Sequence, residues 1–419
     1  MKSLIYRSLI VMIIVVGGGC SRHPPVIPPN NTDIPFFQVS ANSKMVIYVK
    51  AAEYVGLYSS SITASAQVAI DPKFYDHVLA STYNIVITPD SNRVIYTDIY
   101  STLYSSPITS SVPVIIYGGV NNFMVTSDDS AVVFTDSSSN LYSSPITTSV
   151  TSQPLLIDKG VNTFRITPDS SKVVYTNNFS TLYSSPITAS VPVLIDTGVS
   201  NFLITPNSSA VVYTNSSSNL YSSPITVSAP VQIDTRVNSF TVTPDSTRIL
   251  YTKGCVPYTS YPYRYSCSLY SSPITASVPV ELDTDVTNFI VSPDSSKVIY
   301  IKNYSYLYGS PITTSAPWLL ATEARNFAIT PDSSWVVFTT MFGSLYSVPI
   351  TGGTLISIDS ENSTDDFLLT PDSKMIVYRK SRRNSFTGFF AGYTFGLYSS
   401  PITASVPVTI DPGDEWRTQ

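Results

Sequence analysis

The chain has 419 residues, of which 43% are hydrophobic and only 12% are charged. This hydrophobic share suffices for a packed core and argues against a disordered chain. The formal net charge of −5 argues against a nucleic-acid binder, which needs a basic face. A single core stops growing near about 250–300 residues, so the length indicates either two domains or a repeat architecture.

The N-terminal segment has the pattern of an export signal. Lys2 and Arg7 form a short positive region, and the apolar run Leu9–Val16 is too short to cross a hydrocarbon core of about 30 Å as a helix. Three glycines and Cys20 follow this run. The arrangement resembles a bacterial lipoprotein signal, which implies that residues 1–19 are removed and that the Cys20 thiol carries lipid. A plain secreted protein and an uncleaved anchor are the alternatives.

The segment after the signal predicts a tether. Residues 20–33 contain four prolines and no hydrophobic periodicity, so we expect an extended, semi-rigid linker. Ser21 in place of Asp implies, by the same resemblance, an outer-membrane location in a Gram-negative cell. We therefore expect an exported protein that a lipid holds on the membrane, at the outer membrane and periplasm or at the cell surface.

A repeat organises the rest of the chain. The phrase Leu-Tyr-Ser, or a near copy of it, starts at Leu57, Leu103, Leu141, Leu182, Leu220, Leu269, Leu307, Leu345 and Leu397. A Thr-Pro-Asp-Ser motif precedes many copies, in full form at Thr88, Thr167, Thr243, Thr330 and Thr370. The shortest spacing is 38 residues, as between Leu182 and Leu220, so the longer intervals contain insertions.

Each repeat predicts four short strands. In one repeat these are residues 201–205, 210–214, 220–225 and 231–234, with β-branched and aromatic residues in the second. A Pro-Asn-Ser-Ser turn separates the first two strands, because Pro presets φ and a short polar side chain bonds nearby backbone N–H groups. After residue 40 no segment has a sustained helical period.

Four strands in about 40 residues, repeated along the chain, predict an all-β fold and a β-propeller. We expect one propeller over residues 34–412, built of nine four-stranded blades, and a short tail at residues 413–419. Eight blades with one degenerate unit are the close alternative. A β-solenoid is the other alternative, but its coils are shorter and need no turn after every strand.

The repeat resembles a known family. The segment F-x-I-T-P-D-S-S-x-V-V-Y-T followed by L-Y-S-x-P-I-T resembles the periplasmic TolB-like propeller repeat, which also occurs in the N-terminal propellers of dipeptidyl-peptidase-IV-like proteins. The resemblance covers the chain after the tether and implies the propeller fold. The family motif reads Ser-Pro-Asp-Gly, where Gly takes a positive φ, whereas this chain has Ser after the Asp. The G-x-S-x-G motif of the hydrolase half is absent.

The insertions indicate a binding face, because loops between second and third strands share a face with the connections between blades. They cover residues 49–56, 253–268 and 379–396 in blades one, six and nine.

In an exported protein, Cys255 and Cys267 predict a disulfide that closes the insertion at residues 253–268. Free thiols or a metal site are the alternatives. The aromatic tip of this loop is either a recognition patch or packs on its own blade; it contains Tyr258, Tyr261, Tyr263 and Tyr265.

The blade-nine insertion combines basic and aromatic residues, a mixture that suits anionic lipid, a glycan or an acidic partner. It can equally fold over its own blade. The residues that we expect to bind are Arg382, Arg383, Phe386, Phe389, Phe390 and Tyr393.

A third candidate is a polar collar at the mouth of the channel. The residue before the first-strand Phe or Ile is mostly Asn, at Asn84, Asn122, Asn201, Asn288 and Asn326, with Asp366 in the last repeat. These side chains either satisfy backbone groups between blades or bind a small ligand or ion.

We therefore expect a non-catalytic scaffold of the cell envelope that binds a protein or a glycan through its insertion-bearing face. The sequence predicts no cofactor, no metal and no nucleic-acid partner, since it has only 2 His and none of the usual catalytic motifs. One alternative is an enzyme acting on envelope polysaccharide, with Asp366 and Glu361 as its carboxylates. Another is a self-associating surface or adhesive protein.

Overall fold

The computed structural model describes residues 36–40, 45–51, 55–61, 67–75, 84–98, 100–146, 153–257, 265–360, 364–383 and 393–411. These residues form strands and turns, with no helix among them. The predicted signal peptide and Cys20, the tether and the C-terminal tail lie outside them. The chain divides into two compact units: unit 1 has residues 1–199, 206–210 and 223–230, and unit 2 has residues 200–205, 211–222 and 231–419.

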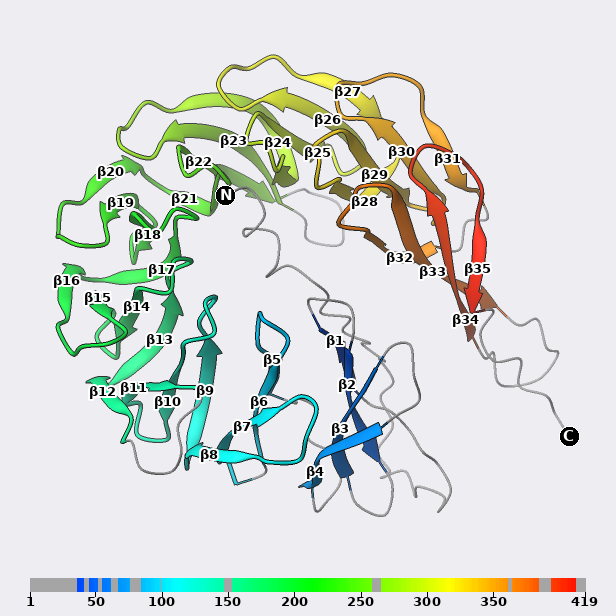
Figure 1. Ribbon diagram of the computed structural model, residues 1–419. Coiled ribbons are helices and arrows are strands. Elements are labelled where there is room, and N and C mark those ends of the chain that lie inside the picture. Colours follow the sequence, from blue (N-terminus) through cyan, green and yellow to red (C-terminus); the bar gives the residue numbers. More distant parts are fainter. Residues whose placement is uncertain are drawn as a thin grey trace, which may run out of the picture. The chain divides into compact units, whose positions relative to one another are not determined.

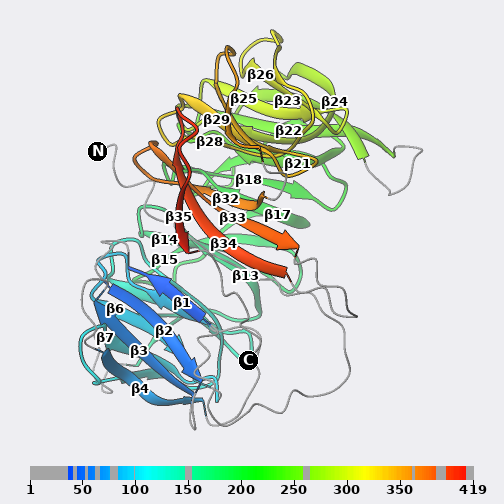
Figure 2. The ribbon, with the colours of Figure 1, turned by 90° about the vertical axis from the view of Figure 1, so that its right-hand side faces the viewer.

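Four antiparallel sheets of four strands each lie in the described part of unit 1, and in each the strands follow chain order (Figure 1). Figure 2 shows the first of these sheets, β1–β4, with its strands side by side. The strands are β1 (Phe36–Val39), β2 (Met45–Ala51), β3 (Val55–Ser61), β4 (Gln67–Tyr75), β5 (Ile85–Ile87), β6 (Arg93–Thr97), β7 (Leu103–Pro107), β8 (Val114–Tyr117), β9 (Val120–Val125), β10 (Ala131–Asp136), β11 (Leu141–Pro145), β12 (Leu155–Asp158), β13 (Val161–Ile166), β14 (Lys172–Asn177), β15 (Leu182–Pro186) and β16 (Val193–Asp196).

Unit 2 continues the pattern, apart from the few residues of the first sheet that belong to unit 1. The strands are β17 (Val199–Ile204), β18 (Ala210–Asn215), β19 (Leu220–Pro224), β20 (Val231–Asp234), β21 (Val237–Val242), β22 (Arg248–Pro257), β23 (Tyr265–Pro273), β24 (Val280–Val291), β25 (Lys297–Lys302), β26 (Tyr306–Pro311), β27 (Trp318–Ala321), β28 (Ala324–Ile329), β29 (Trp335–Thr340), β30 (Leu345–Pro349), β31 (Ile356–Asp359), β32 (Thr364–Leu369), β33 (Met375–Arg383), β34 (Tyr393–Pro401) and β35 (Val408–Asp411).

Strands β21–β27 form one seven-stranded sheet, because the long strand β24 pairs with β23 through its first half and with β25 through its second. We call each group of four consecutive strands a blade, so that β24 closes blade 6 and opens blade 7. The chain is an all-β protein with the four-stranded blades of a β-propeller, as the sequence predicts. That the blades make a single nine-bladed propeller stays a prediction.

The strand boundaries in the repeat chosen for prediction are close to those observed. The first strand starts at Val199, two residues before the predicted residue 201, and the third ends at Pro224. The expectation that the insertions of blades 6 and 9 are loops is wrong at their bases. There the chain continues the antiparallel pairing, from Lys253–Ser268 out to Pro257–Tyr265 and from Lys380–Gly396 out to Arg383–Tyr393.

The core lies between consecutive blades. The second strand is buried on both sides, as in β14, because one side meets the preceding blade and the other the following blade. One cluster joins Val133 and Ile157 of blade 3 with Phe164, Val173 and Ile187 of blade 4. These side chains form the usual sheet-on-sheet contact, and their burial drives neighbouring blades together.

In most of these pairs a buried tyrosine hydroxyl bonds the neighbouring blade. The Tyr175 hydroxyl donates to Asp158, the last residue of the preceding blade, at 2.7 Å, and Tyr300 donates to Asp283 at the same distance. Both phenol pKa values are raised, first by burial and then by the carboxylate. Where the repeat lacks the aspartate, it also lacks the hydroxyl. Phe134 lies against Tyr117, which stands in the place of the aspartate, and Phe338 follows a blade that ends in Ala321.

The serine that replaces glycine in the turn motif has a second role. Ser170, Ser208 and Ser333 all have φ close to +60°, a region that favours glycine. The Ser208 hydroxyl accepts the N–H of Asp169 from the preceding turn at 3.0 Å, and Ser333 accepts that of Asp294 at 3.0 Å. The hydrogen bond to the neighbouring blade offsets the backbone strain, which explains serine here.

Serines of the third strand and of the loop after it also bond the neighbouring blade. Ser190 donates to the carbonyl of Ile157 in the preceding blade at 2.7 Å. Ser184 donates to the carbonyl of Ile225, in the blade that follows, at 2.5 Å. These neutral hydroxyls satisfy backbone carbonyls where blades meet, which explains how the repeat remains rich in serine and poor in charge.

One blade satisfies such a carbonyl in another way. Blade 7 has Gly309 where the other repeats have the donating serine, and a Cβ at this position would lie 2.5 Å from the Trp318 ring. The indole N–H of Trp318 donates to the carbonyl of Ile350 at 3.2 Å. Ile350 follows the Ser-x-Pro of its blade as Ile225 does, so the tryptophan replaces the missing hydroxyl.

Replacing Trp318 and Gly309 tests this compensation. W318V leaves the Ile350 carbonyl without its donor and removes packing, so it lowers the free energy of unfolding by about 2 kcal/mol. G309S forces its Cβ into the indole and is destabilising as well. The double variant restores the consensus pair and recovers most of the loss, as measured by denaturant unfolding. Simply additive losses would contradict the compensation.

Asp129 takes the place of the turn serine in blade 3 and predicts a pH dependence. Its carboxylate accepts the N–H of Asp90 at 2.9 Å, and its other oxygen is buried without a partner. Burial first, and then the Asp90 charge, raise the pKa of Asp129 to about 6. The ionised form therefore destabilises the folded chain progressively as the pH rises from about 4 to about 6, and the penalty disappears near about pH 3, where Asp129 is mostly protonated in both the folded and the unfolded chain.

We expect D129S to have a higher free energy of unfolding than the natural chain at pH 7, by roughly 1 kcal/mol after solvent screening, and to lose this advantage near about pH 3. D128S is the matched control. Although burial raises it, hydrogen bonds from Thr126 and Ser130 keep the pKa of Asp128 below its usual value, so its removal lowers stability at pH 7. A D129S advantage that is the same at both pH values would contradict the assignment.

Candidate functional site

In each blade we call the turn between the second and third strands the second turn, and the connection from one blade to the next the link. The second turns lie beside the links. The N–H of Val161, which starts blade 4, donates to Ser139 in the second turn of blade 3 at 2.8 Å. The N–H of Asn178, in the second turn of blade 4, donates to Gly160 of the link at 2.9 Å. We call this end of the sheets the link face. It is the face on which the sequence predicts the insertions.

Exposed aromatic side chains stand on the link face of blades that have no insertion. In unit 1, Tyr100 is 75% exposed and Phe179 is 85% exposed; in unit 2, Phe342 is 70% exposed. All three occupy the same position of the second turn, where other blades have Ser138 and Ser217. Sequence reasoning missed them, although the alternation of aromatic residue and serine at one repeat position was a usable signal.

A turn closed by side-chain hydrogen bonds presents two of these rings, Tyr100 and Phe179. The Asn177 side chain accepts the N–H groups of Phe179 and Thr181, each at 3.0 Å, and Ser180 adopts φ of 57°. Asn215 holds Ser217 in the same way, with an N–H bond of 3.0 Å. The turn is therefore independent of the third residue, whose side chain makes no contribution to its formation. The exposed rings of Tyr100, Phe179 and Phe342 therefore cover no core.

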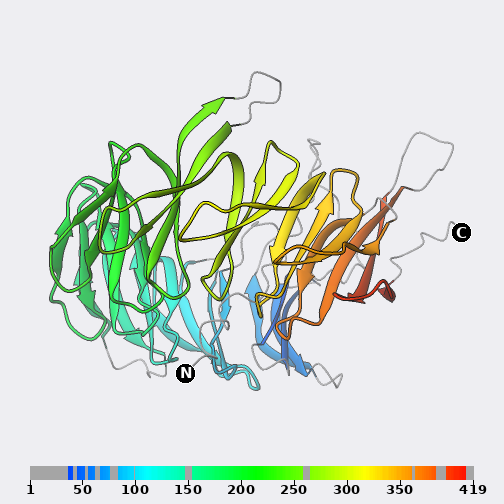
Figure 3. The same cartoon turned by 90° about the horizontal axis from the view of Figure 1, so that it is seen from above.

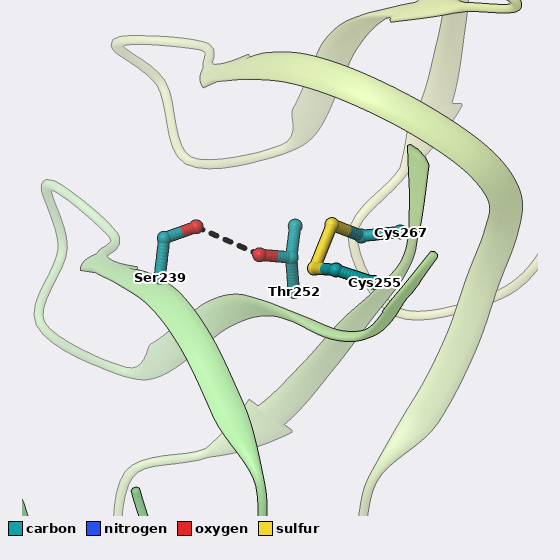
Figure 4. The surroundings of a disulfide bond; sticks show 4 residues. All are labelled: Ser239, Thr252, Cys255 and Cys267. Carbon is teal, nitrogen blue, oxygen red and sulfur yellow. Dashed lines mark hydrogen bonds between the residues drawn. A yellow bond between two sulfur atoms is a disulfide. The ribbon is translucent and has the colours of Figure 1, made fainter. Parts of the chain in front are cut away.

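The blade-6 hairpin is longer than its neighbours and carries the disulfide between Cys255 and Cys267. In Figure 3 its yellow-green end extends past the hairpins beside it in unit 2, and Figure 4 shows the disulfide near the Ser239–Thr252 hydrogen bond. Val256 and Tyr265 flank the disulfide and are 58% and 57% exposed. The predicted tip residues Tyr258, Tyr261 and Tyr263 lie outside the described residues.

The blade-9 hairpin is extended by the pairs Arg382–Thr394 and Arg383–Tyr393. The backbone of these predicted binding residues thus belongs to strands β33 and β34. The aromatic residues expected at its tip fall outside the described part of the chain; they are Phe386, Phe389 and Phe390.

The predicted collar residues share one exposed position on the first strand. The amides make no side-chain hydrogen bond within the described residues, so they do not hold the links between blades; they are Asn84, Asn122, Asn201, Asn288 and Asn326. Asp366 is also exposed and accepts the N–H of Phe367 at 2.9 Å. The links are held instead by backbone bonds such as Val161 to Ser139. A ligand-binding collar stays a prediction.

One collar residue borders a hollow of about 280 Å³ in unit 2, between blades 7 and 8. Thr287 and Asn288 come from β24, and Arg325 comes from β28. The remaining lining residues are Ile301 at the end of β25 and two residues of the second turns, Tyr304 and Met341. The hollow therefore opens at the link face.

Close to the link face, unit 2 adds lysine to the tyrosine–aspartate contact. Lys253 lies 2.6 Å from Asp234, which also accepts the Tyr251 hydroxyl at 2.7 Å. Burial raises the pKa of Asp234, but the hydrogen bonds from Lys253 and Tyr251 outweigh it and lower that pKa below its usual value. Lys253 is therefore held in an ion pair within the protein, and Lys302 pairs with Asp283 in the same manner.

The described residues contain no group of three His, Cys, Asp or Glu side chains placed to hold a metal ion. Of the two carboxylates of the enzyme alternative, Asp366 is exposed and Glu361 lies outside the described residues. No helix among the described residues is long and apolar enough to span a membrane.

Comparison with solved structures supports the fold. A crystal structure titled as the eukaryotic initiation factor matches with a TM-score of 0.53 at 10% identity, over 86% of this chain and 94% of the other. An oligogalacturonate lyase in complex with manganese gives 0.39 at 12% identity, covering 76% and 96%. A putative TolB from Agrobacterium tumefaciens gives 0.32 at 14% identity, covering 52% and 82%.

No family model and no curated protein sequence matches the chain. At 10% identity the first of these structural similarities shows the fold alone. It supports the β-propeller and leaves the activity to be argued from the residues.

We expect the disulfide to stiffen the blade-6 hairpin without holding the blade together. Cys255 and Cys267 are 12 residues apart, and closing a loop of that size stabilises by about 3 kcal/mol in the chain-entropy description. The double variant C255S/C267S should keep its strand content by circular dichroism and gain protease cleavage between residues 255 and 267. Collapse of the whole sheet β21–β27 in this variant would contradict the expectation.

Proposed function

We propose that the protein is a non-catalytic binding scaffold of the cell envelope, which holds a protein or glycan partner on its link face. In this proposal a lipid on Cys20 anchors the exported chain to the membrane through the tether at residues 20–33. The signal-like N-terminus supports the location. The geometry of the link face supports the binding role.

The observation that carries the proposal is the set of exposed rings on the second turns. Tyr100, Phe179 and Phe342 leave most of their apolar surface in water, although the repeat forms the same turn with serine. Exposed aromatic side chains are favourable where they become buried against a partner. Phe179 and Phe342 have no role in the fold that would explain their presence.

A binding role also fits the chemistry of this face. Tyrosine and phenylalanine rings stack against sugar rings or insert into protein pockets, and side-chain hydrogen bonds hold the turns of Tyr100 and Phe179. Lys253 and Lys302 are paired internally and offer no free nucleophile or base. We therefore favour recognition over catalysis.

Self-association is a second candidate, favoured by a different observation. Ile115, Leu156 and Leu194 occupy one position of the fourth strands in unit 1 and are exposed. Fourth strands lie at the edges of their sheets, and exposed apolar edges promote strand pairing between molecules.

Serine substitutions test the proposed function, because serine already occupies this turn position elsewhere in the chain. We expect F179S and F342S to fold as the natural protein does and to reduce retention on purified cell-wall glycan, or on detergent-solubilised envelope proteins, at least fivefold. The full-length protein in detergent is used throughout. V278A, which truncates an exposed side chain outside the second turns, is the matched control and should leave retention unchanged.

Retention that is equal in F179S, F342S and the natural protein would contradict the proposal. Size-exclusion chromatography of the same samples distinguishes self-association from partner binding. A self-associating protein elutes as an oligomer whichever residue occupies the second turns.

A further inference from the structure

The wall of the hollow between blades 7 and 8 contains one positively charged side chain, that of Arg325. Within the described residues the Arg325 guanidinium takes part in no hydrogen bond and no ion pair. Glu323, two residues earlier in the link, is not paired with it. The Asn288 amide likewise has no hydrogen-bond partner in the described part of the chain. Both side chains are exposed and neither is bonded by another described residue, so both are accessible to a ligand at the hollow.

Both groups stand at repeat positions, and the arginine departs from the repeat. The residue before the collar position is Asn121, Asn162 and Asn238 in three other blades, and it is Thr287 in blade 7. Blade 8 has the only positive charge at this position, and blade 9 has Asp365 there. The fold does not need the charge, because the small polar residues of the other blades form the same strand.

Most of the remaining lining is carbon surface, and its threonine hydroxyl is already bonded. The Thr287 hydroxyl donates to the carbonyl of Ile301 at 3.2 Å. Ile301, Tyr304 and Met341 supply carbon and ring surface. A few polar groups on an otherwise apolar wall are typical of a small-molecule site, and about 280 Å³ is small enough to favour a single ring over an extended chain.

We infer that this hollow binds an acidic monosaccharide, that is, a hydroxylated ring with a carboxylate, either free or as a residue of a glycan. The guanidinium matches a carboxylate in geometry and charge. The Asn288 amide both donates and accepts, which suits ring hydroxyls. The apolar wall suits the carbon face of the ring. The inference rests on the proposed function and names a ligand class for the link face of unit 2.

Titration calorimetry of the full-length protein in detergent tests this inference. The probes are glucuronate and galacturonate, with glucose, acetate and inorganic phosphate as comparisons. We expect saturable binding of at least one uronate, and at least tenfold weaker binding of glucose and of acetate, because each offers only part of the contacts. Binding of phosphate as tight as that of the uronate would overturn the inference in favour of a simple anion site.

Two arginine variants localise the effect. R325Q should weaken uronate binding at least tenfold, and R325K should recover part of it through its charge. R236Q, at an exposed arginine in another link of unit 2, should bind as the natural protein does. Equal affinity of R325Q and the natural protein, or no saturable uronate binding at all, would overturn the inference.

The failure of this inference can be told apart from failure of the proposed function. If F179S, a variant in unit 1, loses retention while R325Q binds uronate as the natural protein does, the proposed scaffold role is supported. Only the inference of an acidic monosaccharide is then wrong.

Discussion

Hydroxyl hydrogen bonds between consecutive blades are the constraint on which the structure depends. Each blade is a thin sheet that cannot bury both of its faces alone, so it must lie against a neighbour. At that contact, backbone carbonyls and turn N–H groups lose water and need partners. Ser190, Ser208 and Tyr175 supply them without introducing charge. A charge-poor, serine-rich composition is thus a consequence of repeating one contact along the chain.

The exceptions to the repeat show how strict this requirement is. Trp318 bonds the carbonyl that a serine bonds elsewhere, and Gly309 leaves room for its ring. Phe134 lacks the hydroxyl in the one place in unit 1 where a tyrosine, Tyr117, replaces the acceptor carboxylate. Asp129 keeps the contact to the preceding turn but leaves a carboxylate oxygen unpaired. Changes that remove a partner on one side are matched by a change on the other.

Because the blade contacts use only part of each repeat, the second turns are free to vary. An Asx-type turn forms whether its third residue is serine or phenylalanine, so a ring can be added there without cost to the scaffold. The first strand offers a second variable position, which Arg325 occupies beside the hollow. Rigid turns and a variable residue on each are a means of building a recognition surface from a repeated sequence.

The amino-acid sequence by itself determined the repeat, the four strands of each copy, the all-β blades and the choice of Cys255 and Cys267 as a pair, since these follow from local periodicity and residue type. Only the tertiary structure decided what the polar residues do. It brought Ser208 to Asp169 and Tyr300 to Asp283, and it placed Asn288 and Arg325 around one hollow. Such contacts join residues of different blades, and local patterns contain no information about which side chains meet across an interface.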